Sequence, residues 1–247
     1  MDHTEGGHTV MILTLDNWES LLHDGYEMNT SGTTGEKKRI FQPPDKLDSA
    51  NLVALEVQGI TKGSRILTVG DMARAAGALA QTLPALCIGA KVSIQEFDAL
   101  KFCEEVRAFT HTHLSPEQCE AIQKTASFAE ANFDGLFITI GGDNLSFDII
   151  KALVGRGATV MSNWGMTEIG PIAINTIFRT VEQVEEYRQQ AIPTGTLMGD
   201  QYHCDYRVKD GCLFVKGSTC VTDGWFNTRD LVAVNDQGAM YHLGRGA

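Results

Sequence analysis

Short apolar runs alternate with helical patterns along most of the chain, and this alternation limits the fold more than any other feature. Strands are expected at Arg65–Val69, Lys91–Ile94, Phe109–His113, Leu136–Ile140 and Thr159–Asn163. Helical spacing occurs at Asp48–Gln58, Met72–Leu86, Ala99–Ala108, Phe147–Val154 and in the segment opened by Ser115-Pro116-Glu117. Strands that alternate with helices predict an α/β fold, a layered sheet with helices on its faces.

The pattern changes after about residue 190, where helical spacing gives way to short apolar strands. Those strands are expected at Tyr206–Lys209, Cys212–Lys216, Leu231–Asn235 and Met240–Leu243. The dipeptides Asp210-Gly211 and Gln237-Gly238 are typical of turns that join hairpin strands. We therefore expect an α/β core over residues 1–190 and a small antiparallel β-subdomain over residues 191–247.

The composition indicates a folded globular protein with neither a membrane nor a nucleic acid as partner. Hydrophobic residues make up 43% and charged residues 21% of the chain, and the apolar run Val10–Leu15 is far too short to span a bilayer. A nucleic-acid backbone would be repelled by the net charge of −11. The six cysteines include no Cys-x-x-Cys pair, and without a secretory signal they indicate reduced thiols in a cytoplasmic protein.

The stretch Thr30-Ser31-Gly32-Thr33-Thr34-Gly35-Glu36-Lys37-Lys38 concentrates small residues, hydroxyls and lysines. Glycines let backbone N–H groups come close to an anion, hydroxyls donate hydrogen bonds, and lysines supply positive charge. The stretch is therefore suited to wrapping a polyphosphate. It differs from the common nucleotide loop, because only Thr33 and Thr34 separate Gly32 from Gly35. Taken alone, the stretch could also be a solvated polar turn.

Four segments, in order, resemble motifs of the acyl-adenylate-forming superfamily, which comprises acyl-CoA synthetases, peptide-synthetase adenylation domains and luciferases. The Thr30–Lys38 stretch matches that family's phosphate loop except at Lys37, where the family has proline. The other three segments are Asn163-Trp164-Gly165-Met166-Thr167-Glu168, Gly224-Trp225-Phe226-Asn227-Thr228-Arg229-Asp230-Leu231 and Gly244-Arg245. Arg229 stands where the family has glycine. The resemblance covers residues 30–245 and implies that the chain binds ATP or AMP with magnesium.

The resemblance assigns phosphate and metal binding to named residues. The phosphate loop would act through Thr30, Ser31, Gly32, Thr33, Thr34, Gly35 and Lys38. Thr167 would contact the α-phosphate, and Glu168 would hold magnesium, a hard cation that prefers carboxylate oxygen. Lys38, Thr167 and Glu168 are the catalytic residues that the resemblance implies.

Other matched residues would hold the nucleoside part of the ligand. Asp230 would accept hydrogen bonds from both ribose hydroxyls, and Arg245 would help to hold the ribose or mark the family's hinge. Trp164 occupies the family's aromatic position at the nucleotide and substrate pocket, although core packing is the alternative. Gly141-Gly142-Asp143 resembles a Gly-Gly-Ala stretch beside adenine, and Asp143 adds a charge there.

The substrate side of the expected site includes Arg74, Gly77 and Gly165. The segment Arg74-Ala75-Ala76-Gly77 lies where the family often has His-x-x-Gly lining its acyl pocket. Arg74 could pair with a carboxylate of the substrate, or it could be an exposed helix residue. His111 and His113 have strand spacing that lets both face one side, but no third metal ligand is evident, so a metal there is not favoured.

The leading hypothesis is ATP-dependent activation of a carboxylic acid as an acyl-adenylate, with release of pyrophosphate. The acyl group would then pass to an amine, a thiol or a carrier protein. One alternative is a non-catalytic subunit that binds a nucleotide or an acyl group. Another is an acyltransferase or ligase that takes a pre-activated substrate, with a cysteine as acceptor.

Two departures from the family bear on partners. Only 29 residues precede the loop, and the sequence stops just after Gly244-Arg245, so the family's C-terminal domain with its catalytic lysine has no counterpart. On this basis we expect a truncated enzyme that depends on a partner. A homo-oligomer or a partner protein would cover the exposed sheet faces.

Overall fold

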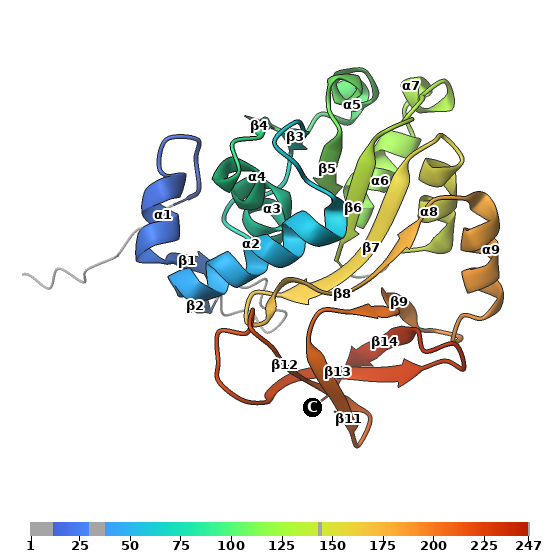
Figure 1. The fold of residues 1–247 in the computed structure, drawn as a ribbon. Helices are drawn as coiled ribbons and strands as arrows, with labels where there is room; N and C mark the ends of the chain where they lie inside the picture. Colours follow the sequence, from blue (N-terminus) through green and yellow to red (C-terminus); the bar gives the residue numbers. More distant parts are fainter. Residues whose placement is uncertain (1–11, 30–37, 143–144, 247) are drawn as a thin grey trace, which may run out of the picture.

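The computed structural model describes residues 12–29, 38–142 and 145–246, which form three sheets (Figure 1). The largest sheet has the strand order β10-β8-β7-β6-β5-β3-β4. Its strands are β3 (Arg65–Thr68), β4 (Lys91–Ile94), β5 (His111–Leu114), β6 (Phe137–Gly141), β7 (Thr159–Met166), β8 (Gly170–Phe178) and β10 (Gln201–Tyr202). Strands β4, β3, β5, β6 and β7 are mutually parallel, β8 runs antiparallel to β7, and β10 pairs antiparallel with β8. Parallel neighbours bring their carboxyl ends to the same edge of the sheet.

Helices cover both faces of this sheet (Figure 1). On one face, Ala54 of α2 (Pro44–Gln58) packs with Met161 of β7, and α4 (Leu83–Cys87) packs on β3. On the other face, α5 (Ala99–Glu105), α6 (Pro116–Gln123) and α8 (Phe147–Val154) share one core cluster with Val160 of β7. Because Val160 and Met161 are neighbours on a strand, they point to opposite faces. The predicted α/β class is confirmed.

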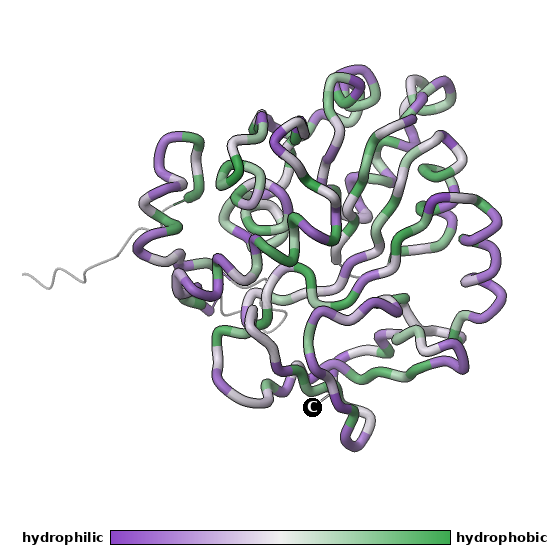
Figure 2. Tube along the Cα trace, in the orientation of Figure 1, coloured by the Kyte–Doolittle hydropathy of each residue, from purple (hydrophilic) through white to green (hydrophobic). Residues whose placement is uncertain are grey.

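The remaining helical elements are shorter or more polar. They are α1 (Trp18–Asp24), α3 (Ala75–Gly77), the 3₁₀ turn η2 (Val106–Ala108), α7 (Ala126–Ala129) and α9 (Val181–Gln189). Figure 2 shows α9 largely in the colour of hydrophilic residues, with only Val184 of this helix fully buried. No helix of the described residues is long and apolar enough to cross a membrane.

A separate antiparallel sheet follows, with the strand order β11-β12-β13-β14-β9. Its strands are β9 (Thr196–Gly199), β11 (Asp205–Lys209), β12 (Cys212–Lys216), β13 (Phe226–Val234) and β14 (Met240–Arg245). This is the small β-region that the sequence predicts. The division at residues 190 and 191 stays a prediction, and one strand from beyond it, β10, pairs with β8 of the larger sheet.

A two-stranded hairpin brackets the predicted phosphate loop. Strands β1 (Tyr26–Asn29) and β2 (Arg39–Gln42) pair in register, with Asn29 opposite Arg39 next to the connecting segment. The buried hydroxyl of Tyr26 donates to the carbonyl of Met72 at 2.7 Å, which ties β1 to the segment that precedes α3. Residues 30–37 themselves lie outside the described residues.

Helix boundaries follow the local capping signals closely. The Ser115 hydroxyl accepts a hydrogen bond from the N–H of Gln118, and the Gln118 side chain accepts one from the N–H of Ser115. Pro116 occupies the first turn of α6. Helix α8 ends at Gly155, and α2 ends at Gly59 in the left-handed conformation with φ 63°. The expected start of α2 at Asp48 is wrong, because the helix begins at Pro44.

The expected helix over Met72–Leu86 is confirmed from Ala75 onward, but it is not one regular α-helix. Helix α3 begins only at Ala75, and the π-helix η1 (Ala78–Thr82) separates it from α4. Pro84 has no N–H to donate, so a regular helix cannot continue through it without loss of a hydrogen bond. The Thr82 hydroxyl instead donates to the carbonyl of Gly77, five residues back, at 2.8 Å. The π-helical turn therefore contains one more residue than an α-helical turn, and α4 continues directly from it.

Candidate active site

A cleft of about 1330 Å³ lies at the carboxyl ends of the parallel strands. Residues at or just after the ends of β3, β5, β6 and β7 line one side of it, and β13 and β14 line the other. The cleft is therefore formed by the larger sheet and the antiparallel sheet together. Crevices at this edge of a parallel sheet are the usual ligand sites of α/β proteins.

Every described residue of the predicted site lines this cleft. They are Lys38, Arg74, Gly77, Gly142, Trp164, Gly165, Thr167, Glu168, Asp230 and Arg245. The first and last of these residues, Lys38 and Arg245, are more than 200 positions apart in the sequence. The loop residues Thr30, Ser31, Gly32, Thr33, Thr34 and Gly35, and also Asp143, lie outside the described residues. The structure brings the described residues together, and the role of each stays a prediction.

Thr167 and Glu168 occupy the tight turn between β7 and β8. The buried amide of Gln42, on β2, donates to the carbonyl of Thr167, and the N–H of Val221 donates to the carbonyl of Glu168 at 3.0 Å. These bonds hold the backbone of the turn from both sides. Strand β2, which follows the predicted phosphate loop in the sequence, is therefore tied to the turn that carries the predicted metal ligand.

Asp230 is almost fully buried, with 2% of its surface exposed, and it faces Arg245 across the β13–β14 pair. Arg245 Nε lies 2.9 Å from Asp230 Oδ1, an ion-pair distance, although the two are not aligned as a hydrogen bond. Arg245 Nη1 also donates to the carbonyl of Thr228 at 3.0 Å. A buried carboxylate needs such a partner, because burial without compensating charge is costly. Recognition of a ribose by Asp230 stays a prediction.

The two predicted substrate-side glycines permit close backbone approach. A Cβ on Gly77 would lie 2.3 Å from the carbonyl oxygen of Asp71, and one on Gly165 would lie 2.4 Å from the carbonyl oxygen of Pro171. Neither distance is possible for a real side chain, so both positions require glycine as the chain is folded. These glycines shape the wall of the cleft.

Arg74 precedes the first turn of α3 rather than lying within a helix. Its Nε lies 3.3 Å from Asp71 Oδ2, and both side chains are more than half exposed, at 58% each. An exposed pair of this kind contributes little to stability. Arg74 thus lies at the cleft as half of an exposed ion pair, and its contact with a substrate stays a prediction.

Two buried polar residues that sequence reasoning missed also line the cleft. They are His113, the third residue of β5, which the sequence relates only to His111, and Asn163 of β7, which the sequence places in a motif without a role of its own. Burial lowers the pKa of His113 to about 4, so its ring is neutral at neutral pH. His111, by contrast, bonds to the carbonyl of Gln58 and does not line the cleft. The position of His113 near the carboxyl end of a predicted strand was the available signal.

With this geometry established, comparison with known proteins gives the family. The family model described as AMP-binding enzyme matches residues 26–212, most of the chain. The chain belongs to the AMP-binding enzyme family. Members of this family activate acids as acyl-adenylates, and the match spans both the Thr30–Lys38 stretch and the Thr167–Glu168 turn.

Individual AMP-binding relatives are distant and longer. The chain is 26% identical over 236 residues to indoleacetate-CoA ligase of Aromatoleum aromaticum, covering 87% of this chain and 46% of the relative. The inhibitor-bound N-terminal domain of FACL13 from Mycobacterium tuberculosis superposes with a TM-score of 0.76 at 20% identity, over 90% of this chain and 61% of that one. O-succinylbenzoate coenzyme A synthetase (MenE) from Bacillus subtilis, in complex with ATP and magnesium ion, gives 0.72 at 19% identity, over 89% and 50%. The chain thus spans about half the length of these relatives, and the structural likeness shows the fold.

Arg229 is the clearest departure of this chain from the AMP-binding motif. Its φ of 61° lies in the left-handed region, which disfavours a residue with a Cβ. The family's glycine suits this backbone, because glycine adopts it without steric cost. This chain adopts the left-handed conformation with an arginine, and the next residue, Asp230, is buried in β13.

A magnesium ion fits this AMP-binding cleft only with help from a ligand. No cluster of three or more His, Cys, Asp or Glu side chains that could hold a metal ion occurs in residues 12–29, 38–142 and 145–246. Magnesium sites in nucleotide-binding proteins commonly use one or two carboxylates together with substrate phosphates. Glu168 in the cleft supplies one such carboxylate, so the donor set fits a phosphate-bridged ion.

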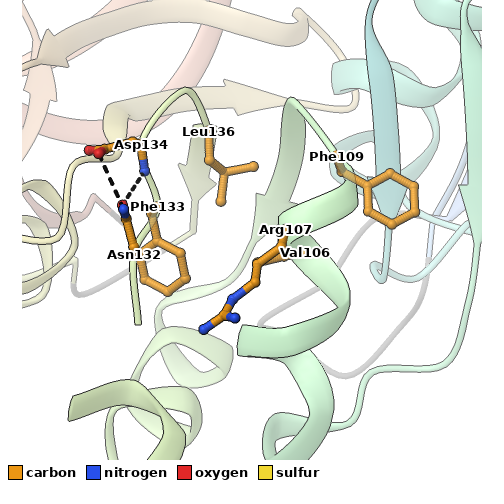
Figure 3. Close-up of a pocket in the computed structure, with 7 residues that line it drawn as sticks. All are labelled: Val106, Arg107, Phe109, Asn132, Phe133, Asp134 and Leu136. Atoms are coloured by element: carbon orange, nitrogen blue, oxygen red, sulfur yellow. Dashed lines mark hydrogen bonds between the residues drawn. The ribbon is translucent and has the colours of Figure 1, made fainter. Parts of the chain in front are cut away.

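A smaller hollow of about 350 Å³ lies at the opposite, amino ends of β5 and β6 (Figure 3). Its lining residues are Val106, Arg107, Phe109, Asn132, Phe133, Asp134 and Leu136. Asn132 and Asp134 satisfy each other, because the Asp134 N–H donates to Asn132 Oδ1 at 2.8 Å and Asn132 Nδ2 donates back to the Asp134 carboxylate. None of the predicted site residues lies there, so the large cleft is the candidate site.

Proposed function

We propose that this chain performs ATP-dependent activation of a carboxylic acid as an acyl-adenylate, with release of pyrophosphate. One observation carries the proposal: Lys38, the Thr167–Glu168 turn and the Asp230–Arg245 pair line a single cleft at the carboxyl ends of the parallel strands. These are cationic, hydroxyl and carboxylate groups, the kinds of group that a nucleoside triphosphate and its metal ion require. Membership of the AMP-binding enzyme family supports the same reaction.

In the proposed reaction, a carboxylate oxygen of the acid attacks the α-phosphorus of ATP and forms the new P–O bond. The bond from the α-phosphorus to the bridging oxygen breaks, and pyrophosphate leaves with the electron pair. Lys38 and the Thr167 hydroxyl would hold the phosphate oxygens, so that the acid approaches in line and the developing charge is neutralised. Magnesium, when bound through Glu168 and the phosphates, supplies further positive charge.

The fate of the acyl group is also a proposal. The two relatives named as CoA ligase or coenzyme A synthetase suggest a thiol acceptor, while an amine or a carrier protein remains open. Because those relatives are about twice as long as this chain, we propose that transfer uses protein segments beyond these 247 residues, from the same or a partner polypeptide. A homodimer would be one way to cover the faces of the sheets.

Acid-dependent exchange of labelled pyrophosphate into ATP tests the proposal. The panel should include indoleacetate and o-succinylbenzoate, the acids for which two of the relatives are named, together with alkyl and aryl acids. Glu168→Gln preserves the shape of the side chain but removes the charge that magnesium needs, so we expect at least about a tenfold loss of exchange. If the wild-type chain bound ATP but exchanged with no acid of the panel, the non-catalytic nucleotide-binding subunit would be the better account.

A further inference from the structure

His113 and Asn163 form a buried polar pair in the wall of the cleft, one strand apart on either side of β6. Both residues line the cleft, and they are 8% and 9% exposed. His113 Nε2 and Asn163 Oδ1 are buried and have no hydrogen-bond partner among the described residues. Buried polar atoms in folded proteins almost always have a partner, so two unpaired atoms beside one cleft call for an explanation.

Gly141 leaves open the space between the two side chains. A Cβ at this position would lie 3.3 Å from His113 Nε2 and 3.5 Å from Asn163 Nδ2. Gly141 also lines the cleft, at the carboxyl end of β6, where it pairs with Asn163. The absence of a side chain at Gly141 therefore gives a ligand a route to both polar residues.

The hydrogen bonds already made define what a ligand must offer. Asn163 Nδ2 donates to the carbonyl of Pro171 at 2.8 Å, which fixes the orientation of the amide and leaves Oδ1 as an acceptor that needs a donor. A neutral imidazole has one N–H and one acceptor nitrogen, so His113 can serve either partner. A hydroxyl group can donate to Asn163 and accept from His113 at once, and an N–H group can satisfy Asn163.

We propose that the His113–Asn163 pair recognises an uncharged hydroxyl or N–H group at the far end of the carboxylic acid. This inference rests on the proposed function, which places the carboxylate of the acid near Thr167. Asn163 and Met166 lie on the same strand, about 10 Å apart at the usual rise per residue. A group that meets Asn163 therefore lies at the end of the acid remote from its carboxylate.

The pair also disfavours some acids. An acid that ends in a plain alkyl or aryl group would leave both polar atoms unpaired, and sites built to bind a hydroxyl discriminate strongly against analogues that lack it. A second carboxylate would be desolvated next to groups that carry no opposite charge. The alternative for a diacid is Arg74, which already pairs with Asp71.

The test is direct binding of matched acids to the 247-residue chain by calorimetry, with no chemical step required. The pairs are para-hydroxyphenylacetate with phenylacetate, and omega-hydroxyoctanoate with octanoate; suberate serves as the diacid. We expect each hydroxylated acid to bind roughly tenfold to a hundredfold more tightly than its partner, the range set by an unpaired buried polar group. Suberate should bind more weakly than omega-hydroxyoctanoate.

Variants separate recognition from structural damage. Asn163→Leu and His113→Leu should reduce the preference to less than about threefold, and Gly141→Ala should do the same by filling the space between them. His111→Leu is the matched control, because it removes a buried β5 histidine outside the cleft and should keep the preference.

Equal binding within the pairs, tighter binding of suberate, no binding of any acid, or an unchanged preference in Gly141→Ala would overturn the proposal. Failure of pyrophosphate exchange with intact binding preference would contradict the proposed function alone.

Discussion

At the scale of single residues, the cleft depends on a few backbone positions that tolerate little change. Arg229 adopts the left-handed conformation at which the family has glycine, one residue before the buried Asp230. The departure at Arg229 was visible in the sequence, but its cost was not, because φ depends on how β13 bulges against β12 and β14.

We predict that Arg229→Gly is more stable than Arg229→Ala by about 1 kcal/mol, since only alanine keeps the Cβ that the left-handed backbone disfavours. Both variants lose the same side-chain charge, so the comparison isolates the backbone. Denaturant unfolding of the two variants measures the difference. Equal stabilities, or a more stable alanine variant, would show that the left-handed conformation is not strained.

Titration of His113 makes the folding stability of the protein depend on pH, and the direction of this dependence is known. Burial lowers its pKa from 6.5 to about 4, so the unfolded chain binds a proton at a higher pH than the folded chain does. The neutral, buried His113 therefore does not reduce the folding stability above about pH 6.5, and the stability falls as the pH drops from 6.5 towards 4. Between pH 7 and pH 5 the wild type should lose about 2 kcal/mol more than His113→Leu. Parallel losses in the two proteins would contradict the buried neutral state.

At the scale of elements, the sequence predicted those helix ends that depend on neighbouring residues. The capping box at Ser115, the end of α8 at Gly155 and the left-handed cap at Gly59 were all predictable, because each depends on neighbouring residues. Strand β8 was not predicted, since all nine of its residues are buried and no alternation marks it as a strand. Pro84 was visible in the sequence, but the π-helix η1 was not predicted, because it also depends on a contact from outside the helix, the hydrogen bond from Gln58 of α2 to the carbonyl of Ala80 at 2.7 Å.

The Asp71–Gly77 contact provides a prediction for the element that carries Arg74. Gly77→Ala should destabilise the fold by about 1–3 kcal/mol, because its Cβ cannot fit against the carbonyl oxygen of Asp71 without moving the α3 segment. Gly63→Ala is the control, since its Cβ meets only the Thr61 hydroxyl at 3.8 Å. Thermal unfolding distinguishes the two. A Gly77→Ala protein as stable as Gly63→Ala would show that the close approach is not needed.

At the scale of the whole molecule, the site exists only where the two sheets meet. The order of motifs predicted which residues belong to the site, and the structure gathers the described ones around one cleft. The motifs could not reveal His113, because its role depends on being buried beside Gly141 and Asn163 of other strands. Nor could they reveal that Asp230 is paired with Arg245, which follows from the register of β13 and β14.

We propose that one nucleotide spans this cleft, with its phosphates at Lys38 and its ribose at Asp230. Calorimetry with ATP and with AMP on three variants tests it most directly. Lys38→Ala should weaken ATP binding by about tenfold or more and AMP binding much less, since a charge-assisted contact to the outer phosphates is lost. Asp230→Asn should weaken both nucleotides alike, and Lys62→Ala, an exposed lysine outside the cleft, should change neither. Unchanged ATP affinity in Lys38→Ala, or an Asp230→Asn variant that weakens ATP and AMP very differently, would contradict the account.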